Sequence, residues 1–247
     1  MKTEMSAVVL AAGKGTRLRT KGCDLPKVMR LADGKPLLEY VLRGLDFIPR
    51  ERTVIVVGYK KEEVIRAFPG YRFAVQEEQL GTGHAAMSAE QALAGFTGPV
   101  LVCCGDMPLI TGETYRAMAE TWEESGAACV MLTGTSDVYL PYGRIVRDGN
   151  GEFVCVVEEK DCSEEQKAIT ELNSGVYVFD CEKLFGALRR IRCDNAQKEY
   201  YLTDVPAILR EDGEKIALCR RELGSEIIGV NTIEQLQQVE RILQERK

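Results

Sequence analysis

Three short, mostly apolar runs constrain the fold of this 247-residue chain more than any other feature. They lie at residues 7–10, 53–57 and 100–104, and they carry apolar side chains on both faces, as strands buried between two layers do. The stretches between them repeat apolar residues at helical spacing. This alternation predicts an α/β fold with a Rossmann-like, mixed and mainly parallel sheet flanked by helices, and it places ligands at the carboxyl ends of the strands.

Helices are expected between these runs. Residues 37–45 place leucine and valine side chains on one face, and Pro36 favours a helix that begins directly after it. The apolar residues near 64–68 indicate a second helix, and residues 84–93 and 113–122 indicate two more. Each helix is predicted to cover one face of the sheet.

The pattern changes after Gly134. Residues 143–147 and 152–157 flank Asp148-Gly149-Asn150-Gly151, which is a strong signal for an antiparallel hairpin. Residues 171–179 predict another strand, and residues 203–209 predict a helix capped by Thr203. The sheet is therefore expected to be mixed in this half of the chain.

The C-terminal segment carries one apolar stripe at helical spacing, formed by Ile233, Leu236, Val239 and Leu243. Packing of the helix onto the core explains such a stripe. No linker rich in Pro, Gly or Ser and no internal repeat interrupts the sequence. We therefore expect a single domain over residues 1–247, with a helix at 231–247.

Charge and composition exclude several classes of protein. The net charge of −6 argues against a nucleic-acid-binding protein, because binding to a phosphate backbone needs a basic stripe. The nine cysteines are odd in number and lack Cys-x-x-Cys spacing, so free and mostly buried thiols are expected. The sequence predicts neither a signal peptide nor a membrane span. We expect no membrane partner and a reducing, cytoplasmic compartment.

A glycine-rich segment follows the first apolar run. Gly13 and Gly15 allow backbone N–H groups to approach phosphate oxygens, while Lys14, Arg17 and Lys27 offset negative charge. The segment matches neither the dinucleotide fingerprint, which has a third glycine at the position of Leu18, nor a P-loop. A plain tight turn with solvated basic side chains remains the alternative.

Asp106 follows the third apolar run, at the edge where α/β sheets bind ligands. One well-placed carboxylate suits Mg²⁺, which is held by one or two protein oxygens together with phosphates and waters. The alternative is a helix cap for the segment that begins near Thr111.

Motifs along the whole chain resemble one known family. Residues 10–27 resemble the signature of sugar-1-phosphate nucleotidylyltransferases, and residues 76–84 narrow the resemblance to the bacterial N-acetylglucosamine-1-phosphate uridylyltransferase type. Further matches follow in the family's order at 105–109, 142–145, 158–161, 172–175, 199–204 and 229–231. The resemblance implies the fold of nucleotide-diphospho-sugar transferases.

The resemblance also implies roles for individual residues. Arg17 and Lys27 are implied as catalytic, and Asp106 and Asn231 as ligands of Mg²⁺. The implied nucleotide-binding residues are Leu10, Ala11, Ala12, Gly13, Gln76, Gln79, Gly81 and Thr82. The implied sugar-binding residues are Gly143, Glu158, Asn173, Tyr201 and Thr203.

The implied reaction is Mg²⁺-dependent transfer of UMP from UTP to N-acetylglucosamine-1-phosphate, giving UDP-N-acetylglucosamine for cell-envelope precursors, and pyrophosphate. It needs in-line alignment and charge stabilisation but no covalent enzyme intermediate. Residues 1–110 would mainly bind the nucleotide and residues 111–230 the sugar. The alternatives are a relative that uses another sugar or dTTP, and a catalytically silent regulatory subunit that binds nucleotide sugars. The oligomeric state is left open.

Several of these residues also have a purely structural interpretation. Gln76 and Gln79 fit exposed polar positions, and Tyr200 and Tyr201 fit the core. Glu158 with Lys160 fits a surface ion pair. Asn231 fits the N-cap of the final helix, alone or in addition to its role as a metal ligand. His84, the only histidine, is interpreted as a local polar contact rather than a catalyst.

The chain departs from the family pattern at a few positions. Arg30 stands where many relatives have histidine, Cys104 precedes Gly105-Asp106 where others vary, and two extra residues lengthen the loop around Lys21-Gly22-Cys23. In bifunctional members of the family the final helix leads into a β-helix acetyltransferase domain of hexapeptide repeats. This sequence contains no such repeats, so we expect no acetyltransferase activity and leave open whether the chain is free-standing or a fragment.

Overall fold

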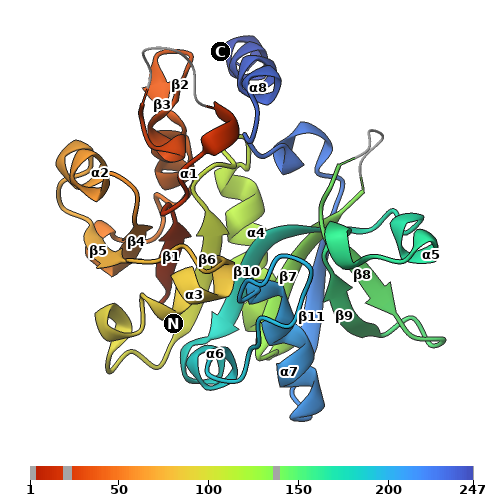
Figure 1. Cartoon of the computed structure of the whole chain (residues 1–247). Coiled ribbons are helices and arrows are strands. Elements are labelled where there is room, and N and C mark those ends of the chain that lie inside the picture. Colours follow the sequence, from red (N-terminus) through yellow and green to blue (C-terminus); the bar gives the residue numbers. More distant parts are fainter. Residues whose placement is uncertain (1–3, 19–23, 136–139, 247) are drawn as a thin grey trace.

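The computed structural model describes residues 4–18, 24–135 and 140–246. The predicted loop extension at Lys21-Gly22-Cys23 lies outside these ranges. Within them, the chain forms a central sheet with helices on both faces (Figure 1).

The main sheet is mixed, as predicted. Its strand order is β11-β7-β10-β6-β1-β4-β5. Strands β1, β4, β5 and β6 run parallel to one another, whereas β10 is antiparallel to both of its neighbours, β6 and β7, and β11 is parallel to β7. The bounds are β1 Ser6–Leu10, β4 Thr53–Val57, β5 Arg72–Val75, β6 Pro99–Cys104, β7 Cys129–Gly134, β10 Leu172–Asp180 and β11 Ile216–Arg221. The three apolar runs of the sequence are therefore adjacent strands, with β1 between β4 and β6.

Two hairpins extend this frame. The predicted hairpin is present as β8 (Arg144–Arg147) and β9 (Phe153–Val157), and β8 also pairs with the start of β10. A smaller hairpin joins β2 (Leu31–Ala32) to β3 (Lys35–Pro36).

Helices cover both faces of the sheet. The α-helices are α1 Leu37–Gly44, α2 Lys61–Ala67, α3 Thr82–Met87, α4 Gly112–Ser125, α5 Glu164–Lys167, α6 Cys181–Leu188, α7 Val205–Glu211 and α8 Ile233–Glu245. The 3₁₀ turns are η1 Thr16–Leu18, η2 Lys27–Met29, η3 Arg50–Arg52, η4 Gln91–Leu93, η5 Glu159–Asp161, η6 Leu202–Asp204 and η7 Gly224–Ile227.

The core divides along the alternation of side chains in the strands. Val9 and Ile55 point to the face covered by α1, α2 and α4, where they meet Leu38 and Tyr115. Val8 and Val54 point to the opposite face, which α3, α6 and α7 cover. Burial of apolar side chains on both faces explains why these strands are nearly continuous apolar runs.

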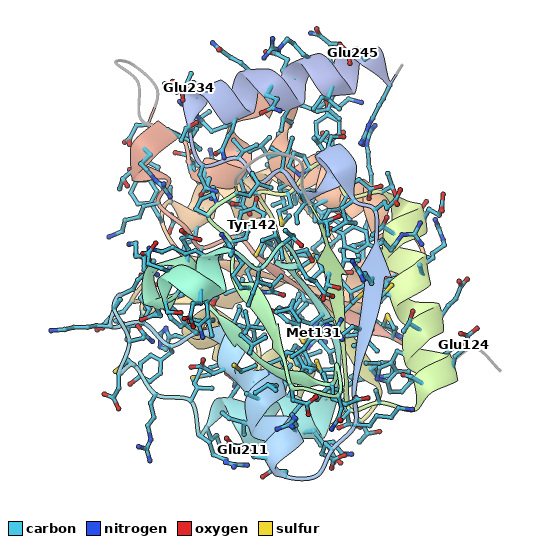
Figure 2. All side chains as sticks on the ribbon, turned by 90° about the vertical axis from the view of Figure 1, so that its right-hand side faces the viewer. Glu124, Met131, Tyr142, Glu211, Glu234 and Glu245 are labelled. Carbon is cyan, nitrogen blue, oxygen red and sulfur yellow. The ribbon has the colours of Figure 1, made fainter. Side chains whose placement is uncertain are left out.

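A third, smaller cluster holds the C-terminal helix. Val239 and Leu243 of α8 are buried against Leu37 and Ala32, while Ile233 and Leu236 pack against the same cluster. Figure 2, in which Glu234 and Glu245 mark the two ends of α8, shows this helix across the top of the molecule, above the sheet residue Met131. The predicted apolar stripe is therefore a packing face.

The starts and ends of three helices differ from the sequence predictions. The helix expected at 84–93 is split, because the Ser88 N–H bonds to both the His84 and the Ala85 carbonyls and the chain tightens into 3₁₀ turns after α3. Thr203 does not cap α7, since its hydroxyl donates to Glu158. The final helix is capped by Thr232 in a capping box with Gln235, so Asn231 is not its N-cap.

The eight cysteines in the described part of the chain are free thiols, as predicted, but four are buried and four are only partly buried, so half rather than most of them are buried. None of the helices within residues 4–18, 24–135 and 140–246 has the length and apolar character that crossing a membrane requires.

Candidate functional site

Two adjoining hollows lie at the edge of the sheet where β1 and β6 end and β10 begins. The first, here called the loop hollow, has a volume of about 230 Å³ and is lined by Leu10, Ala11, Ala12, Gly13, Lys27, Val28, Gln76, Gln79, Gly81, Thr82, Ala85, Cys104, Asp106 and Glu199. The second, here called the hairpin hollow, has a volume of about 190 Å³ and is lined by Leu10, Thr82, Cys104, Asp106, Met107, Pro141, Tyr142, Gly143, Glu158, Asn173, Ser174, Gly175, Tyr177, Leu202, Thr203, Gly229 and Asn231. The two hollows share a wall formed by Leu10, Thr82, Cys104 and Asp106.

Three predicted residues meet at this wall. Lys27, at the start of η2, forms an ion pair with the Asp106 carboxylate just beyond β6. The same Lys27 ammonium donates a hydrogen bond of 2.7 Å to Oδ1 of Asn231. A carboxylate oxygen and an amide oxygen from distant parts of the chain therefore face one positive charge.

The backbone holds Asn231 in this position. The Val230 N–H donates to the Asp106 carbonyl at 2.9 Å, and the Asn231 N–H donates to the Gln235 side chain at 2.7 Å. Because Gln235 also completes the capping box of α8, the start of that helix fixes the residue before it. Asp106 does not cap a helix; Thr111 caps α4 by accepting from the Thr114 N–H at 3.3 Å.

Tyr142 ties the hairpin hollow to the same segment. Its hydroxyl accepts from the Gly229 N–H and donates to the Ile227 carbonyl, both at 2.8 Å. Burial raises the pKa of Tyr142 well above its usual value, so the hydroxyl keeps the proton that it donates. Figure 2 labels Tyr142, which is partly buried, between α8 and the sheet residue Met131 in that view.

The oxygens of Asp106 and Asn231 fit Mg²⁺, since the Lys27 ammonium already occupies the position of a cation between them. In the ranges 4–18, 24–135 and 140–246, no group of three or more His, Cys, Asp or Glu side chains is arranged to hold a metal ion. Two protein oxygens together with substrate phosphates are an ordinary coordination set for Mg²⁺.

The loop hollow is built mainly from backbone that leaves parallel strands. The Ala11 N–H extends the β1–β4 pairing to the Val56 carbonyl at 2.8 Å, and the Gly105 N–H bonds to the Leu10 carbonyl at 2.9 Å. The first bond holds the start of the glycine-rich segment against β4, and the second holds the residue before Asp106 against the end of β1. Gly13 is exposed beside them.

Gln76 and Gln79 lie beside this backbone. Gln76 is buried; its amide nitrogen donates to the Gly81 carbonyl at 3.1 Å and lies 3.2 Å from Nδ1 of His84. Gln79 donates to the Gln76 carbonyl at 3.3 Å. Gln76 is therefore not the exposed polar residue of the alternative interpretation, and His84 makes the local polar contact predicted for it.

The segment 81–83 is joined to the segment 200–202. Gly81 has a φ of +112°, and a Cβ there would lie 2.6 Å from the Tyr200 carbonyl oxygen. The Gly83 N–H donates to that oxygen at 2.7 Å, and the Leu202 N–H donates to the Thr82 hydroxyl at 3.1 Å. Glycine is required at Gly81 because the two backbones touch there.

The hairpin hollow is built mainly from side chains. Glu158, just after β9, accepts a hydrogen bond of 3.0 Å from the Thr203 hydroxyl. Asn173 on β10 donates to the Tyr177 hydroxyl at 2.7 Å, and its N–H bonds to the Gly143 carbonyl at 2.8 Å. Residues from β9, β10 and η6 therefore meet in one polar cluster, and Glu158 is not a surface partner of Lys160.

Burial raises the pKa of the Glu158 carboxyl above its usual value, while the hydrogen bond from Thr203 opposes that shift. The charges of Asp204 and Asp161 raise it further. A carboxylate held in this way gains from a hydroxyl donor, because each added hydrogen bond stabilises its charged form.

Two predicted site residues lie elsewhere. Arg17 is exposed on η1 and does not line either hollow. Tyr201 is buried, and its hydroxyl donates to Asp161 at 3.3 Å; it lines a separate hollow of about 300 Å³ that also includes Glu158 and Asp204. The core interpretation therefore describes Tyr201 in this structure, and its contact with a sugar stays a prediction.

Sequence reasoning left out several lining residues, among them Tyr142, Tyr177, Gly175 and Glu199. Tyr142 and Glu199 lie inside motifs that pointed to their neighbours, so adjacency was the available signal. Gly175 also lies inside such a motif, at 172–175, but its φ of +79° and its place beside the Cys104 sulfur are backbone features that no spacing in the sequence indicates.

The departures from the family pattern are partly explained. Arg30 is buried and donates to the Leu18 carbonyl, so it holds the end of the glycine-rich segment. Cys104 lies in the shared wall, where burial and the charge of Asp106 raise the pKa of its thiol.

A family model described as the MobA-like NTP transferase domain matches residues 7–208 of the chain. The chain belongs to this family. The match runs from within β1 to within α7 and therefore includes most residues of both hollows.

Curated relatives are similar over almost the whole chain. The Bifunctional protein GlmU of Streptococcus thermophilus (strain CNRZ 1066) is 44% identical over 241 residues, which are 97% of this chain and 52% of that protein. The Bifunctional protein GlmU of Exiguobacterium sp. (strain ATCC BAA-1283 / AT1b) is 47% identical over 245 residues, 98% of this chain and 53% of that protein. The chain thus spans about half the length of the curated relatives that it matches.

Solved structures confirm the fold. A UDP-glucose pyrophosphorylase complexed with UDP-glucose has a TM-score of 0.74 at 18% identity, covering 98% of this chain and 99% of that chain. A Bacillus anthracis protein assigned as a glucose-1-phosphate thymidylyltransferase, in complex with sucrose, has a TM-score of 0.73 at 17% identity, with coverages of 96% and 94%. The predicted nucleotidyltransferase fold is therefore correct.

Proposed function

We propose that the chain transfers a uridylyl group from UTP to N-acetylglucosamine-1-phosphate, with Mg²⁺, giving UDP-N-acetylglucosamine and pyrophosphate. The convergence of Lys27, Asp106 and Asn231 on the wall between the two hollows carries this proposal. A nucleotide in one hollow and a sugar phosphate in the other would bring their phosphates together at that wall.

The chain's contribution to the reaction is positional and electrostatic. The sugar phosphate attacks the α-phosphorus of UTP in line with the departing pyrophosphate, so both substrates must be held in a fixed orientation. Lys27 lies at the meeting point and would neutralise charge that develops on the phosphates. We propose the same role for Arg17, which would reach the triphosphate from the exposed turn η1.

Mg²⁺ would be held by Asp106 and Asn231 and would withdraw charge from the phosphate oxygens. Lys27, which now pairs with both oxygens, would then turn its ammonium towards the phosphates. GlmU-type nucleotidyltransferases generally use a divalent metal, and the oxygen-only pair of ligands favours Mg²⁺.

The loop hollow is proposed to bind the nucleotide. The backbone of Leu10, Ala11, Ala12 and Gly13 would contact the nucleoside and phosphates, as would Gly81 and Thr82. The amides of Gln76 and Gln79 would bind the uracil edge, which presents both donors and acceptors. In this assignment residues 1–110 supply most of the nucleotide site.

The hairpin hollow is proposed to bind the sugar. Glu158 and Asn173 would accept hydrogen bonds from hydroxyl and amide groups, and Gly143 would contribute backbone groups. Thr203 orients Glu158, and we keep Tyr201 as a proposed contact through the segment that it shares with Thr203. Residues 111–230 thus supply most of the sugar site.

The identities of the sugar phosphate and of the nucleotide are proposed in addition to the type of reaction. A relative that uses another sugar phosphate or dTTP would keep the same wall and differ in the lining of the hollows. A catalytically silent sensor would have no need for Lys27, Asp106 and Asn231 together, and their contacts favour an enzyme. We propose small-molecule partners and no nucleic-acid or membrane partner, and the free thiols fit a reducing cytoplasm.

The test is release of pyrophosphate by the purified chain with Mg²⁺ and UTP. N-acetylglucosamine-1-phosphate is compared with glucose-1-phosphate, glucosamine-1-phosphate and a reaction without sugar. We expect release that depends on the N-acetylated sugar, and none with EDTA. Preference for another sugar would replace the substrate assignment, and nucleotide binding without release would support the silent sensor.

A further inference from the structure

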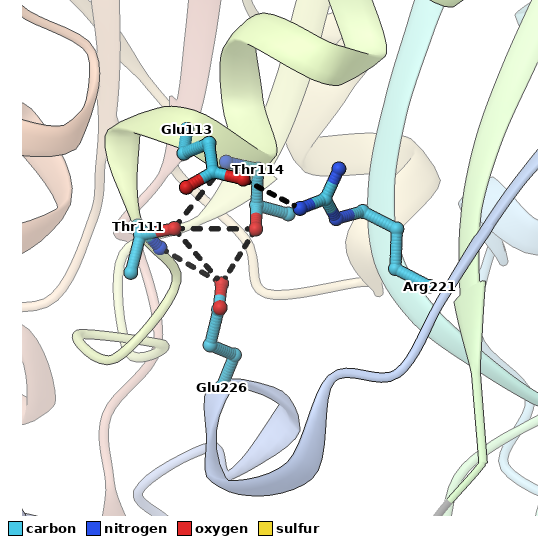
Figure 3. Close-up of polar contacts among 5 residues, drawn as sticks. All are labelled: Thr111, Glu113, Thr114, Arg221 and Glu226. Carbon is cyan, nitrogen blue, oxygen red and sulfur yellow. Dashed lines mark hydrogen bonds and ion pairs between the residues drawn. The ribbon is translucent and has the colours of Figure 1, made fainter.

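An acidic side chain outside the two hollows contacts the helix start that lies beside the segment carrying Asn231. Glu226 lies on η7, and its Oε2 atom accepts three hydrogen bonds from the start of α4. The donors are the Thr111 N–H at 3.0 Å, the Thr111 hydroxyl at 3.3 Å and the Thr114 hydroxyl at 2.7 Å (Figure 3).

These contacts are stronger than those of a surface carboxylate. Thr114 is fully buried, so its hydroxyl depends on a partner inside the protein. Thr111 is the N-cap of the 14-residue α4, where the helix dipole and unpaired N–H groups favour a negative charge. Hydrogen bonds to an ionised acceptor are roughly twice as strong as neutral ones.

The residues between Glu226 and Asn231 are also fixed, so the anchoring of Glu226 constrains the position of Asn231. Ile227 and Val230 are fully buried, which leaves the segment little freedom to shift. The Gly229 N–H bonds to the Tyr142 hydroxyl, and the Val230 N–H bonds to the Asp106 carbonyl. The Glu226 carboxylate, the hydrogen bond to Tyr142 and the hydrogen bond to Asp106 together fix the course of the chain between Glu226 and Asn231.

We propose that Glu226 is a positioning residue for the metal-assisted reaction: its carboxylate anchors residues 224–231 to the start of α4, so that the Asn231 side chain faces Asp106 before any ligand binds. The assignment of a reaction to this site rests on the proposed function. The anchor itself is a property of the unliganded chain.

The neighbouring Glu113 provides a matched control. Its carboxylate lies in the first turn of the same helix and accepts from Arg221 at 3.0 Å (Figure 3). The Glu113 side chain is 83% exposed. Removal of Glu113 therefore deletes an acidic side chain and a link to β11 at the same helix end without touching η7. Arg246, which contacts Ser225 at 3.2 Å and the Leu109 carbonyl at 2.9 Å, still holds η7 when Glu226 is changed.

The first measurement is amide hydrogen exchange of residues 227–231 without nucleotide or metal, in Glu226→Ala, Glu226→Gln and Glu113→Ala. We expect Glu226→Ala to speed exchange at Gly229 and Val230 by about tenfold, because local opening becomes easier. Glu226→Gln keeps one acceptor and should give an intermediate rate. Glu113→Ala should match the wild type in this segment.

The second measurement is the Mg²⁺ concentration that gives half-maximal transfer. Loss of residues that orient metal ligands weakens metal affinity by about tenfold or more, and we expect that shift for Glu226→Ala with kcat at saturating Mg²⁺ within about threefold of the wild type. The Mg²⁺ concentration that Glu226→Gln requires should lie between those of the wild type and Glu226→Ala. Glu113→Ala should require the same Mg²⁺ concentration as the wild type.

Three results would overturn the proposal: unchanged exchange at 227–231, equal effects of Glu226→Ala and Glu113→Ala, or a lower kcat at saturating Mg²⁺ with an unchanged Mg²⁺ requirement. If Glu226→Ala does not fold, Glu226→Gln decides by the same criteria. A wild-type chain that transfers no uridylyl group contradicts the proposed function alone, and hydrogen exchange then decides whether the anchor exists.

Discussion

The two hollows meet at one wall, yet they are built in different ways. The loop hollow uses backbone that continues from parallel strands, together with two glutamines that lie three positions apart. The hairpin hollow uses side chains from β9, β10 and η6, including Glu158, Asn173 and Thr203. The backbone-built hollow appears in the sequence as compact motifs, whereas the side-chain-built hollow becomes a site only when antiparallel strands bring distant residues together.

The wall between the hollows should be the most sensitive point. We expect Asp106→Asn to lower turnover by roughly two orders of magnitude or more, because it removes the anionic ligand proposed to hold Mg²⁺, the cation that would stabilise the charge developing on the phosphates. The effect should appear with every sugar and every nucleotide. Steady-state rates measure it, with Asp46→Asn as a control for loss of an exposed carboxylate. Near-normal turnover would remove Asp106 from the mechanism.

A change in the hairpin hollow should affect one substrate. Glu158→Gln removes a half-buried carboxylate acceptor, and we expect the KM for the sugar phosphate to rise by about tenfold, with the KM for UTP within about twofold. Because the Thr203 bond lowers the raised pKa of Glu158, Thr203→Val should move the acid limb of kcat/KM for the sugar phosphate to higher pH. Equal changes in both KM values would show that the hollows are not separate in function.

A change in the loop hollow should affect the nucleotide, and the effect should be smaller than that of Glu158→Gln on the sugar phosphate. Gln76→Ala removes a neutral amide, and we expect selectivity for UTP over CTP to fall by roughly fivefold while the preference among sugar phosphates stays constant. Competition between the two triphosphates measures the ratio. Gln91→Ala, which changes an exposed glutamine on η4, provides the control. Unchanged selectivity would argue against a role of Gln76 in base recognition.

The smallest expected effect concerns the free energy of unfolding and the residue Asp204, which follows the hairpin-hollow residue Thr203. Burial and the charge of Asp161 raise the pKa of Asp204 to about 6. A carboxyl group whose pKa is raised by folding favours the folded state when protonated, so its contribution is lost as the pH rises through that pKa. We expect Asp204→Asn to raise the free energy of unfolding at pH 7.5 by about 1 kcal/mol after allowance for solvent screening, and the gain to vanish towards pH 4.

Thermal unfolding at both pH values checks this prediction, and roughly 2 °C is the expected shift in Tm at pH 7.5. Asp46→Asn, at an exposed ion pair, should give no gain at either pH. A gain that persists at pH 4 would mean that packing, rather than ionisation, limits this position.

Much of the fold could be predicted because its signals are local. The runs 53–57 and 100–104 are strands because every side chain in them is buried or nearly so, and Asp148-Gly149-Asn150-Gly151 turns the hairpin as expected. Helix boundaries were predicted less well. The predicted helix at 84–93 is split by 3₁₀ hydrogen bonding at Ser88. Thr203 does not cap α7, because its hydroxyl donates to Glu158, which lies 45 positions away in the chain.

The candidate site likewise has residues that local sequence predicts and residues that only the tertiary structure brings together. Asp106 could be placed at the edge of the sheet from the strand that precedes it, and the glycine-rich segment from its own residues. The meeting of Lys27 with Asn231, 204 positions apart, depends on how the final helix packs. The part played by Glu226 depends on its contact with a helix start that lies 115 positions earlier, and no spacing in the sequence encodes that contact.

The narrow shared wall has an evolutionary consequence. Among the described residues, Leu10, Thr82, Cys104 and Asp106 line both hollows, and the other lining residues belong to one hollow each. Under the proposed assignment, we expect substitutions of residues that line one hollow, other than Lys27 and Asn231, to alter preference for one substrate while Lys27, Asp106 and Asn231 stay in place. We therefore expect preference for the sugar and preference for the base to change independently, through substitutions in one hollow at a time.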